Sequence, residues 1–579
     1  MRLTTERLGW QGVDEAVAER PWWREWQAAC LVLFVVVAFG SRLTELSIRG
    51  EESRRGLIAR EMLSTGDWII PRTQGVPLFS RPPLQNWIIA GLGWMRGDVD
   101  AFAIRFPSVC AILAMSLMIY RYGRRFLSPL GALAASLAFA SMGQVLELGR
   151  TGETDALFTL FVSGALLAWH GGIQGGKSPY RTWCLGYALA ALGTLTKGPQ
   201  APVYFVAPVG VYLLLTGRWR FAFSRAHLAG LATFFGVLAA WQIPCLFMVG
   251  VEGVVRMYVS DVGQRFTDAN WFSFGAHLAE YPLELLLCLL PWSSLLIVWW
   301  NREFRRTLGT YRDPALFLAI CLVVSFPTVW FPPGSRPRYF MSLYPCLALL
   351  VGLAIERVTA ASRTQSWWVV WPLFVKIVSG CMLLLGLGFL AISIVTPELW
   401  LAQPMGTAVA YALVAACLAA CAWRSVGSGH RQAPVMALLA IAGFVGISNA
   451  TVILNGMSNA TVDTEGAIAD LKEQLPPDAK LVSFNVTHHL FTFHYRDDLP
   501  VVDWPENSET PAARVEYFCA DAREFETKEL PFPWKPVVEI SCDRRKLREP
   551  RIRVVIGRRT DLVSDSKQSS PSPPQILAN

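Results

Sequence analysis

Long apolar runs, separated by short polar segments, make up most of the chain. Residues 1–26 are polar and end in a Trp-rich stretch, and the first apolar run follows at Ala28 without a small-residue cleavage site after it. A helix needs about 20 apolar residues to cross about 30 Å of hydrocarbon. Further runs begin near Phe102, Pro129, Asp155, Tyr180, Ala201, His227, Pro282, Pro314, Pro337, Trp367, Met405 and Pro434. The pattern predicts an α-helical polytopic membrane protein with about thirteen transmembrane helices within residues 27–455, after a cytoplasmic leader at 1–26.

Basic residues collect after every second apolar run. Cytoplasmic loops of membrane proteins carry the excess of Lys and Arg, so these segments are predicted to face the cytoplasm. They contain Arg121, Arg124, Arg125, Lys177, Arg181, Arg218, Arg220, Arg225, Arg302, Arg305, Arg306, Arg312, Arg357, Arg363, Arg424 and Arg431. The opposite loops carry fewer basic residues, except the long first outer loop at 47–105, which is itself rich in arginine. A basic loop on the outer side calls for a functional explanation.

Composition supports the membrane assignment. The chain is 53% hydrophobic and 17% charged, whereas a soluble domain has about 45–50% apolar and about 25% charged residues. A soluble or disordered protein is therefore excluded. The net charge of +8 comes largely from arginines beside the apolar runs, so the sequence predicts contact with the lipid bilayer and no nucleic-acid partner.

The polar segment 456–560 is predicted to be a small α/β domain. An odd number of spans places it outside the cytoplasm. We expect a helix at Thr464–Gln474 with Thr464 as its N-cap, and strands at Lys480–Asn485, Val537–Ser541 and Ile552–Ile556. The tail at 561–579, rich in Ser and Pro, is predicted to be disordered.

Cysteines and histidines in this polar segment do not form a metal motif. Cys519 and Cys542 either pair as a disulfide or remain free thiols, and the sequence leaves both open. His488, His489 and His494 lie close together, and we expect a surface cluster there instead of a ligand set.

The first outer loop contains two predicted helices. One covers Glu51–Met62, with an apolar stripe that suits a helix lying along the membrane surface. The other covers Ser80–Trp94, where Pro82 and Pro83 stand near its start. On the first helix, Glu51 and Arg55 at four-residue spacing form either an intrahelical ion pair on a solvated face or part of a site.

Ordered motifs in this loop resemble those of a known superfamily. The matching segments are 51–54 (EESR), 59–62 (AREM), 64–72 (STGDWIIPR), 75–77 (GVP) and 81–87 (RPPLQNW), with weaker matches at 154–155 (TD), 196–199 (TKGP), 264–266 (QRF), 290–292 (LPW) and 338–345 (RYFMSLYP). The chain thus resembles membrane glycosyltransferases of the GT-C superfamily, near the aminoarabinose lipid A transferases and protein mannosyltransferases. The resemblance also implies thirteen spans and an outer C-terminal domain.

The resemblance implies an inverting transfer of a sugar from a polyprenyl-phosphate-linked donor to an acceptor on the extracytoplasmic face. The family places a catalytic carboxylate, usually Asp, where Glu51 stands, and Glu52 is a neighbour that would share the role. A carboxylate suits a general base that takes the proton of the acceptor hydroxyl. Asp155 matches a second acidic residue of the family.

Basic and phenolic residues are expected to bind the donor phosphate. By resemblance, Arg81, Arg265 and Tyr339 contact it, together with Arg338 and Lys197. Guanidinium groups bind phosphate oxygens in pairs and stabilise a leaving phosphate. The alternative is that each is an interfacial residue that extends to lipid headgroups, or, for Lys197, part of the scatter of positive charge.

Departures from the family limit what the resemblance implies. Arg55, Leu78 and Ser80 replace residues of the close lipid A transferases, one of which is linked with a structural metal, so neither a metal nor a cofactor is predicted. The sequence predicts a lipid-linked glycosyltransferase, in a bacterial inner membrane, acting on a glycolipid, glycan or protein. The alternatives are a polytopic transporter and a non-catalytic GT-C-like envelope-assembly protein. Transporters usually carry their polar residues near the bilayer midplane, whereas here charges gather in the first loop and at span ends.

Overall fold

The structure is a computed structural model that describes residues 21–79, 81–263, 271–362, 364–399, 401–507, 515–543, 552–561 and 576–577. The chain forms two compact units. The first unit contains Met1–Ser41, Ser80–Pro82 and Ser108–Ile453, and the second contains Arg42–Phe79, Pro83–Pro107 and Leu454–Asn579. The first loop, apart from residues 80–82, therefore belongs to the same unit as the C-terminal segment.

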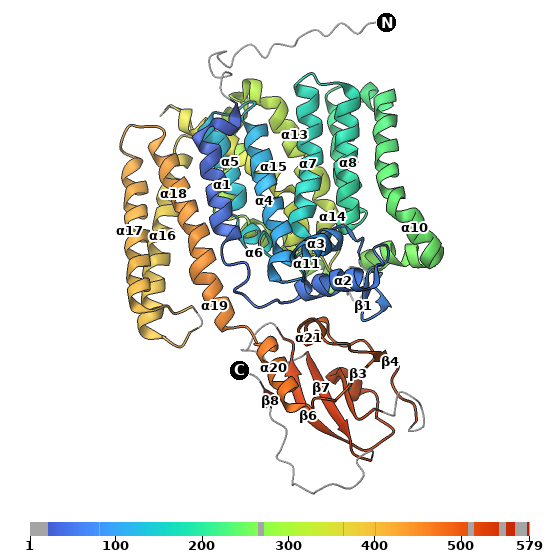
Figure 1. Ribbon diagram of the computed structural model, residues 1–579. Coiled ribbons are helices and arrows are strands. Elements are labelled where there is room, and N and C mark those ends of the chain that lie inside the picture. The colour runs from blue at the N-terminus through green and yellow to red at the C-terminus, as the bar shows by residue number, and fades with distance from the viewer. Residues whose placement is uncertain are drawn as a thin grey trace. The chain divides into compact units, whose positions relative to one another are not determined.

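The first unit is helical (Figure 1). Its helices are α1 (Trp26–Val35), α5 (Pro129–Ala140), α6 (Gly143–Leu148), α7 (Asp155–Gln174), α8 (Pro179–Lys197), α9 (Gln200–Leu215), α10 (Arg225–Gly263), α11 (Trp271–Cys288), α12 (Arg302–Arg306), α13 (Arg312–Ser325), α14 (Pro327–Trp330), α15 (Tyr344–Ala360), α16 (Val370–Val395), α17 (Met405–Ser425) and α18 (Ala433–Ser448), and most of α4 (Ala101–Gly123) also lies here. The unit also contains two 3₁₀ segments, η5 (Trp292–Trp300) and η7 (Pro337–Leu343).

Eight helices among the described residues are long and apolar enough to cross a membrane, and a bent pair formed by Phe274–Cys288 and Trp292–Trp300 would make nine. Three shorter apolar helices cover Trp26–Gly40, Pro129–Ala140 and Gln200–Leu215. Each apolar run found in the sequence lies at or close to a helix, which confirms an α-helical multi-pass membrane protein. The number thirteen itself stays a prediction.

Neighbouring helices pack through small residues. Helix α5 has the sequence PLGALAASLAFA, and all its residues from Gly131 to Ala140 are buried, where α15 packs against it. Small side chains let two helix backbones approach closely. The resulting van der Waals contact stabilises the pair, because no hydrophobic driving force acts between helices in lipid. Helix α8 likewise packs between α7 and α10 (Figure 1). This packing aligns the end of α8 with the start of α7.

The C-terminal segment of the second unit is a mixed sheet with two helices. The strands are β3 (Leu481–Phe484), β4 (Val501–Val502), β5 (Tyr517–Asp521), β6 (Trp534–Ser541), β7 (Arg553–Arg559) and β8 (Ile576–Leu577), and the helices are α20 (Thr464–Gln474) and α21 (His489–Tyr495), which follow α19 (Leu454–Asn459). The strand order is β4-β3-β5-β7-β6-β8. Strand β3 is parallel to β4 and β5, β7 is antiparallel to β5 and β6, and β8 is parallel to β6.

The sequence placed the helix and three strands of this segment in the right order and missed three strands and α21. The expected N-cap was wrong, because the side chain of Asp463 accepts the hydrogen bond from the backbone N–H of Gly466. Thr464 instead donates its hydroxyl to the carbonyl of Ser541, 3.0 Å away. Residues 562–575 of the predicted tail lie outside the described residues.

The first loop shares one hydrophobic core with the C-terminal segment. The loop forms α2 (Glu51–Thr65), α3 (Leu84–Arg96) and a short hairpin of β1 (Arg72–Thr73) and β2 (Val76–Pro77). Ile58 and Met62 of α2 are buried in a cluster that also contains Ile468 of α20 and Phe491 of α21. The prediction that this apolar stripe lies on the membrane surface was therefore wrong for Ile58 and Met62.

Helix α2 makes close contacts with α21. A Cβ at Gly56 would lie 2.5 Å from the ring of Phe493 and 2.7 Å from Ile104, so a larger residue does not fit there. The guanidinium of Arg60 stacks on the same ring, 4.0 Å from its centroid, and donates to the carbonyl of Phe493 at 2.6 Å. A cation held on an aromatic face contributes about 0.5–2 kcal/mol.

The histidines predicted to form a surface cluster are only partly exposed, so that prediction was wrong in part. Nδ1 of His489 forms a 2.7 Å hydrogen bond with the hydroxyl of Ser53 in α2. Burial and the nearby Arg54 lower the pKa of His488 to about 4, and burial and His488 lower the pKa of His489 to about 2. Both rings are therefore neutral in the folded protein at neutral pH.

The second unit is expected to lose stability on acidification. In the unfolded chain these histidines titrate near about 6.5, so below that pH the unfolded state binds more protons than the folded state. The free energy of unfolding should fall as the pH decreases from about 6.5 to 4. Hydrogen exchange of α21 in the whole detergent-solubilised protein, corrected for the intrinsic pH dependence, measures this.

The matched variants are His489→Gln and His430→Gln, because His430 is exposed. The first should flatten the pH dependence of α21 protection, and the second should leave it unchanged. Equal protection at pH 7.5 and pH 5 in the wild type would contradict the assignment of these buried neutral rings.

Candidate functional site

A buried ion pair lies at the start of α7 in the first unit. Asp155 is the first residue of α7 and is 2% exposed, and Lys197 is the last residue of α8 and is 6% exposed. The Nζ of Lys197 lies 2.6 Å from Oδ1 of Asp155. Buried charges are tolerated when they are paired, so the two helix ends are joined at this point.

The two residues before Asp155 contact two further cations. Arg81 donates from Nη1 to the hydroxyl of Thr154 at 2.8 Å. Nη1 of Arg338 lies 3.6 Å from Oε1 of Glu153. Residues 153–155 at the start of α7 thus contact three cations from distant parts of the chain: Arg81, Lys197 and Arg338.

Tyr339 completes this group, which we call the cation cluster: Arg81, Glu153, Thr154, Asp155, Lys197, Arg338 and Tyr339. The Nζ of Lys197 lies 5.0 Å from the centroid of the Tyr339 ring, and the guanidinium carbon of Arg338 lies 5.9 Å from it. Tyr339 belongs to η7, which packs on α7. A phenol hydroxyl beside two cations is a suitable donor to an anion.

The charge balance of the cation cluster favours an anionic ligand. Its three cations, Arg81, Lys197 and Arg338, stand against two carboxylates, Glu153 and Asp155. Oδ2 of Asp155 is buried and has no hydrogen-bond partner among the described residues. Among the described residues the cluster therefore has one cation in excess, which favours an anion, while Oδ2 of Asp155 is an acceptor that lacks a donor.

Five of the eight residues predicted from the sequence lie in this cluster: Arg81, Asp155, Lys197, Arg338 and Tyr339. Arg265 lies outside the described residues. Lys197 is buried and paired, which excludes the alternative that it is scattered positive charge. Thr154 belonged to the matched motif at 154–155, but no role in the site was predicted for it or for Glu153, although their position directly before Asp155 was a usable signal.

Glu51 lies in the second unit, at the first position of α2. It follows Gly50, whose φ of 56° is a left-handed conformation that glycine adopts without strain. Its Oε2 accepts from Nη1 of Arg54 at 2.8 Å and lies 4.0 Å from Nη2 of Arg55. An intrahelical ion pair of Glu51 is thus present, but its close partner is Arg54 and Arg55 is buried, so this is not the solvated face that was expected. The side chain of Glu51 is still 33% exposed, so the carboxylate remains accessible.

Glu52 is bound differently from its neighbour. It is 1% exposed, and its two oxygens accept from Nε and Nη2 of Arg105 at 2.8 and 2.9 Å. Arg105 also donates to the carbonyls of Leu43, Leu46 and Ser47. A carboxylate held by both oxygens is a poor proton acceptor, which assigns Glu52 to holding the segment before α2 in place.

Neither a group of metal ligands nor a Cys519–Cys542 disulfide is found among the described residues. Within the described ranges, no group of three or more His, Cys, Asp or Glu side chains is arranged to hold a metal ion. Cys519 and Cys542, left open by the sequence, are free and buried. Burial raises the pKa of the Cys519 thiol to about 12, so this thiol is unreactive at neutral pH.

Comparison with known proteins agrees with the sequence motifs. Residues 80–242 match the family described as dolichyl-phosphate-mannose-protein mannosyltransferase. The undecaprenyl phosphate-alpha-4-amino-4-deoxy-L-arabinose arabinosyl transferase of Edwardsiella ictaluri is 29% identical over 337 residues, or 57% of this chain and 59% of that protein. The enzyme of the same name from Pseudomonas aeruginosa is 29% identical over 426 residues, or 70% of this chain and 72% of that protein.

The fold is also similar to a solved structure. ArnT from Cupriavidus metallidurans bound to undecaprenyl phosphate has a TM-score of 0.65 and 19% sequence identity, with 93% of this chain and 99% of that chain covered. The GT-C fold and the resemblance to aminoarabinose transferases are therefore confirmed. The chain spans only 59% of the length of the first of these relatives.

Removal of the Glu52 carboxylate should destabilise the second unit. Glu52→Gln leaves the buried guanidinium of Arg105 without its counter-charge, and breaking one partner of a buried pair costs about 3–5 kcal/mol. Hydrogen exchange of residues 43–65 in the whole protein should rise accordingly. Glu45→Gln is the matched control, because Glu45 is exposed and its pair with Arg42 contributes about 0–1 kcal/mol. Equal exchange in the two variants would show that the Glu52–Arg105 pair holds nothing in place.

Proposed function

We propose that this chain is an integral-membrane glycosyltransferase that transfers a sugar, with inversion, from a polyprenyl-phosphate-linked donor to an acceptor. The cation cluster carries the proposal, because it combines excess positive charge with a tyrosine and a buried carboxylate that fixes Lys197. The curated relatives are undecaprenyl phosphate-alpha-4-amino-4-deoxy-L-arabinose arabinosyl transferases, and this similarity supports a polyprenyl-phosphate-linked donor.

In this proposal the cation cluster binds the phosphate of the donor. Arg81 and Arg338 supply N–H groups in a planar fork, which matches phosphate oxygens, and Lys197 supplies a compact charge. Thr154 and Glu153 orient the two guanidinium groups before the donor arrives. As the bond between the anomeric carbon and the phosphate oxygen breaks, negative charge grows on that oxygen. Donors already in place stabilise this charge in the transition state.

Glu51 is proposed as the general base. Its carboxylate accepts the proton of the acceptor hydroxyl while that oxygen forms the new bond to the anomeric carbon, on the side opposite the phosphate. Attack from that side inverts the configuration. Arg54 holds one oxygen of the carboxylate, and the partly exposed side chain leaves access for an acceptor. Glu52, with both oxygens bound to Arg105, positions this segment and does not take the proton.

We propose that the reaction takes place on the extracytoplasmic face of a bacterial inner membrane. The alternating distribution of arginine supports this orientation, because it leaves Asp155, Lys197 and the first loop on the side opposite the basic loops. The acceptor is proposed to be a glycolipid of the lipid A kind, since the motifs of the first outer loop resemble those of the aminoarabinose lipid A transferases. Another glycan or a protein is the alternative acceptor.

Glu51→Gln should abolish transfer while donor binding persists. The amide keeps the shape of the side chain and cannot take a proton, and loss of a general base typically costs about 10²–10⁴-fold in rate. The measurement is sugar transfer by the whole protein in nanodiscs with a saturating acceptor. Glu45→Gln, an exposed acid on the same segment, is the control and should keep full activity. Full activity of Glu51→Gln would reject Glu51 as the base, whereas a wild type without transfer activity would favour a non-catalytic GT-C-like protein.

Loss of either guanidinium of the cation cluster should slow transfer by roughly a hundredfold, as for other preorganised donors to developing charge. Arg81→Gln, Arg338→Gln and the double variant are compared with Arg336→Gln, which removes an exposed cation two residues from Arg338. The double variant should lose less than the product of the single losses, because both groups contact one anion.

Rates at varied concentrations of polyprenyl-linked donor measure these losses. Arg336→Gln should behave as the wild type. If the losses from Arg81→Gln and Arg338→Gln simply multiply, or if Arg336→Gln is equally slow, the shared phosphate site is wrong.

A further inference from the structure

A second basic site lies in the first unit, at the opposite end of α7 from Asp155. It is a pocket of about 270 Å³ between the ends of α4, α7 and α8. Its lining includes the four cations Arg121, Arg125, Lys177 and Arg181. Because Asp155 begins α7 and this pocket is near its last turn, the pocket is separate from the cation cluster.

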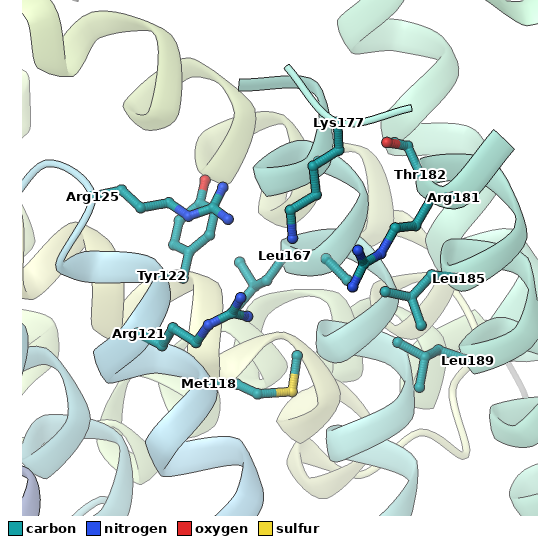
Figure 2. Close-up of a pocket in the computed structure, with 12 residues that line it drawn as sticks. Met118, Arg121, Tyr122, Arg125, Leu167, Lys177, Arg181, Thr182, Leu185 and Leu189 are labelled. Atoms are coloured by element: carbon teal, nitrogen blue, oxygen red, sulfur yellow. The ribbon is translucent and has the colours of Figure 1, made fainter. Parts of the chain in front are cut away.

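Four cations surround this pocket, and none of the described residues that line it is acidic. The charged ends of Arg121, Lys177 and Arg181 point toward the same central space (Figure 2). Arg125 is anchored by a hydrogen bond to the carbonyl of Gly171. Burial and the neighbouring Arg121, Arg181 and Arg125 lower the pKa of Lys177. Like charges held this close repel one another, and an anion between them would relieve the repulsion.

Part of the pocket wall is apolar. It is formed by Met118, Leu167, Leu185 and Leu189, and Leu185 is 44% exposed (Figure 2). The positive-inside bias accounts for cations on this side of the membrane, but it does not require them to converge on a cavity. A ligand that fits both walls carries an anionic head and an apolar tail.

We propose that this pocket binds the phosphate group of a membrane lipid, with the lipid chain along Leu185 and Leu189. Basic pockets between transmembrane helices bind anionic lipid headgroups, and each nearby Lys or Arg strengthens such binding. A free phosphate ion would satisfy the cations and leave the apolar wall exposed to water. The site differs in position and residues from the proposed donor site, so it does not depend on the transferase activity.

Native mass spectrometry of the whole protein in detergent tests this proposal. Phosphatidylglycerol, phosphatidylcholine with the same acyl chains, and undecaprenyl phosphate are added separately, and bound lipid is counted. Phosphatidylglycerol should bind in preference to phosphatidylcholine. The variants are Lys177→Gln and the double substitution Arg121→Gln with Arg181→Gln. The matched control is Arg305→Gln with Arg306→Gln, which removes two exposed cations elsewhere in the same unit.

The pocket double variant should bind phosphatidylglycerol roughly tenfold more weakly, and the control should bind it normally. Lys177→Gln, in the turn between α7 and α8, should weaken binding without affecting the folding of either helix. Stronger retention of undecaprenyl phosphate than of phosphatidylglycerol, lost in the same variants, would identify the carrier lipid as the source of the phosphate.

Three results would overturn the proposal. The first is equal loss in the pocket and control variants, which would indicate general surface electrostatics. The second is equal binding of phosphatidylcholine and phosphatidylglycerol, which would show that the net charge of the headgroup does not determine binding. The third is displacement of bound lipid by millimolar inorganic phosphate, which would make the pocket a site for the free ion.

Discussion

The contact between Asp155 and Lys197 is the interaction on which the candidate site depends. Both charges are removed from water, and such a pair is retained only when each partner compensates the desolvation of the other. Glu153 and Asp155 supply two negative charges against the three cations Arg81, Lys197 and Arg338, so the cluster keeps one positive charge in excess. This excess makes the site suitable for phosphate, because a bound anion would neutralise the remaining positive charge.

A second buried pair has the corresponding role in the other unit. Arg105 directs all its donors to Glu52 and to three carbonyls of residues 43–47, which fixes the chain just before α2. Glu51 is the residue before Glu52, but its carboxylate binds Arg54 and is partly exposed to solvent. Two adjacent acids thus have different surroundings, because one is buried against a guanidinium and the other is partly exposed at a helix start.

Local patterns predicted much of this arrangement. Apolar runs predicted the helices, and Asp155 and Lys197 stood out as charges at the ends of neighbouring runs, which the hairpin of α7 and α8 brings together. The sequence did not show that Ile58 packs with Phe491, because pairing across so many residues leaves no local periodic signal. For the same reason His488 and His489 seemed exposed in a polar segment. Glu52 could not be distinguished from Glu51 until Arg105 was seen to bind it.

The central claim is that the protein transfers a sugar from a polyprenyl-phosphate carrier. The most direct test is mass spectrometry of membrane lipids and envelope glycans from cells with and without the gene. The account predicts that one sugar increment disappears from a single envelope component when the gene is absent, while the sugar-bearing polyprenyl phosphate accumulates. Identical profiles of acceptors and carrier lipids, in cells that express the protein, would contradict it.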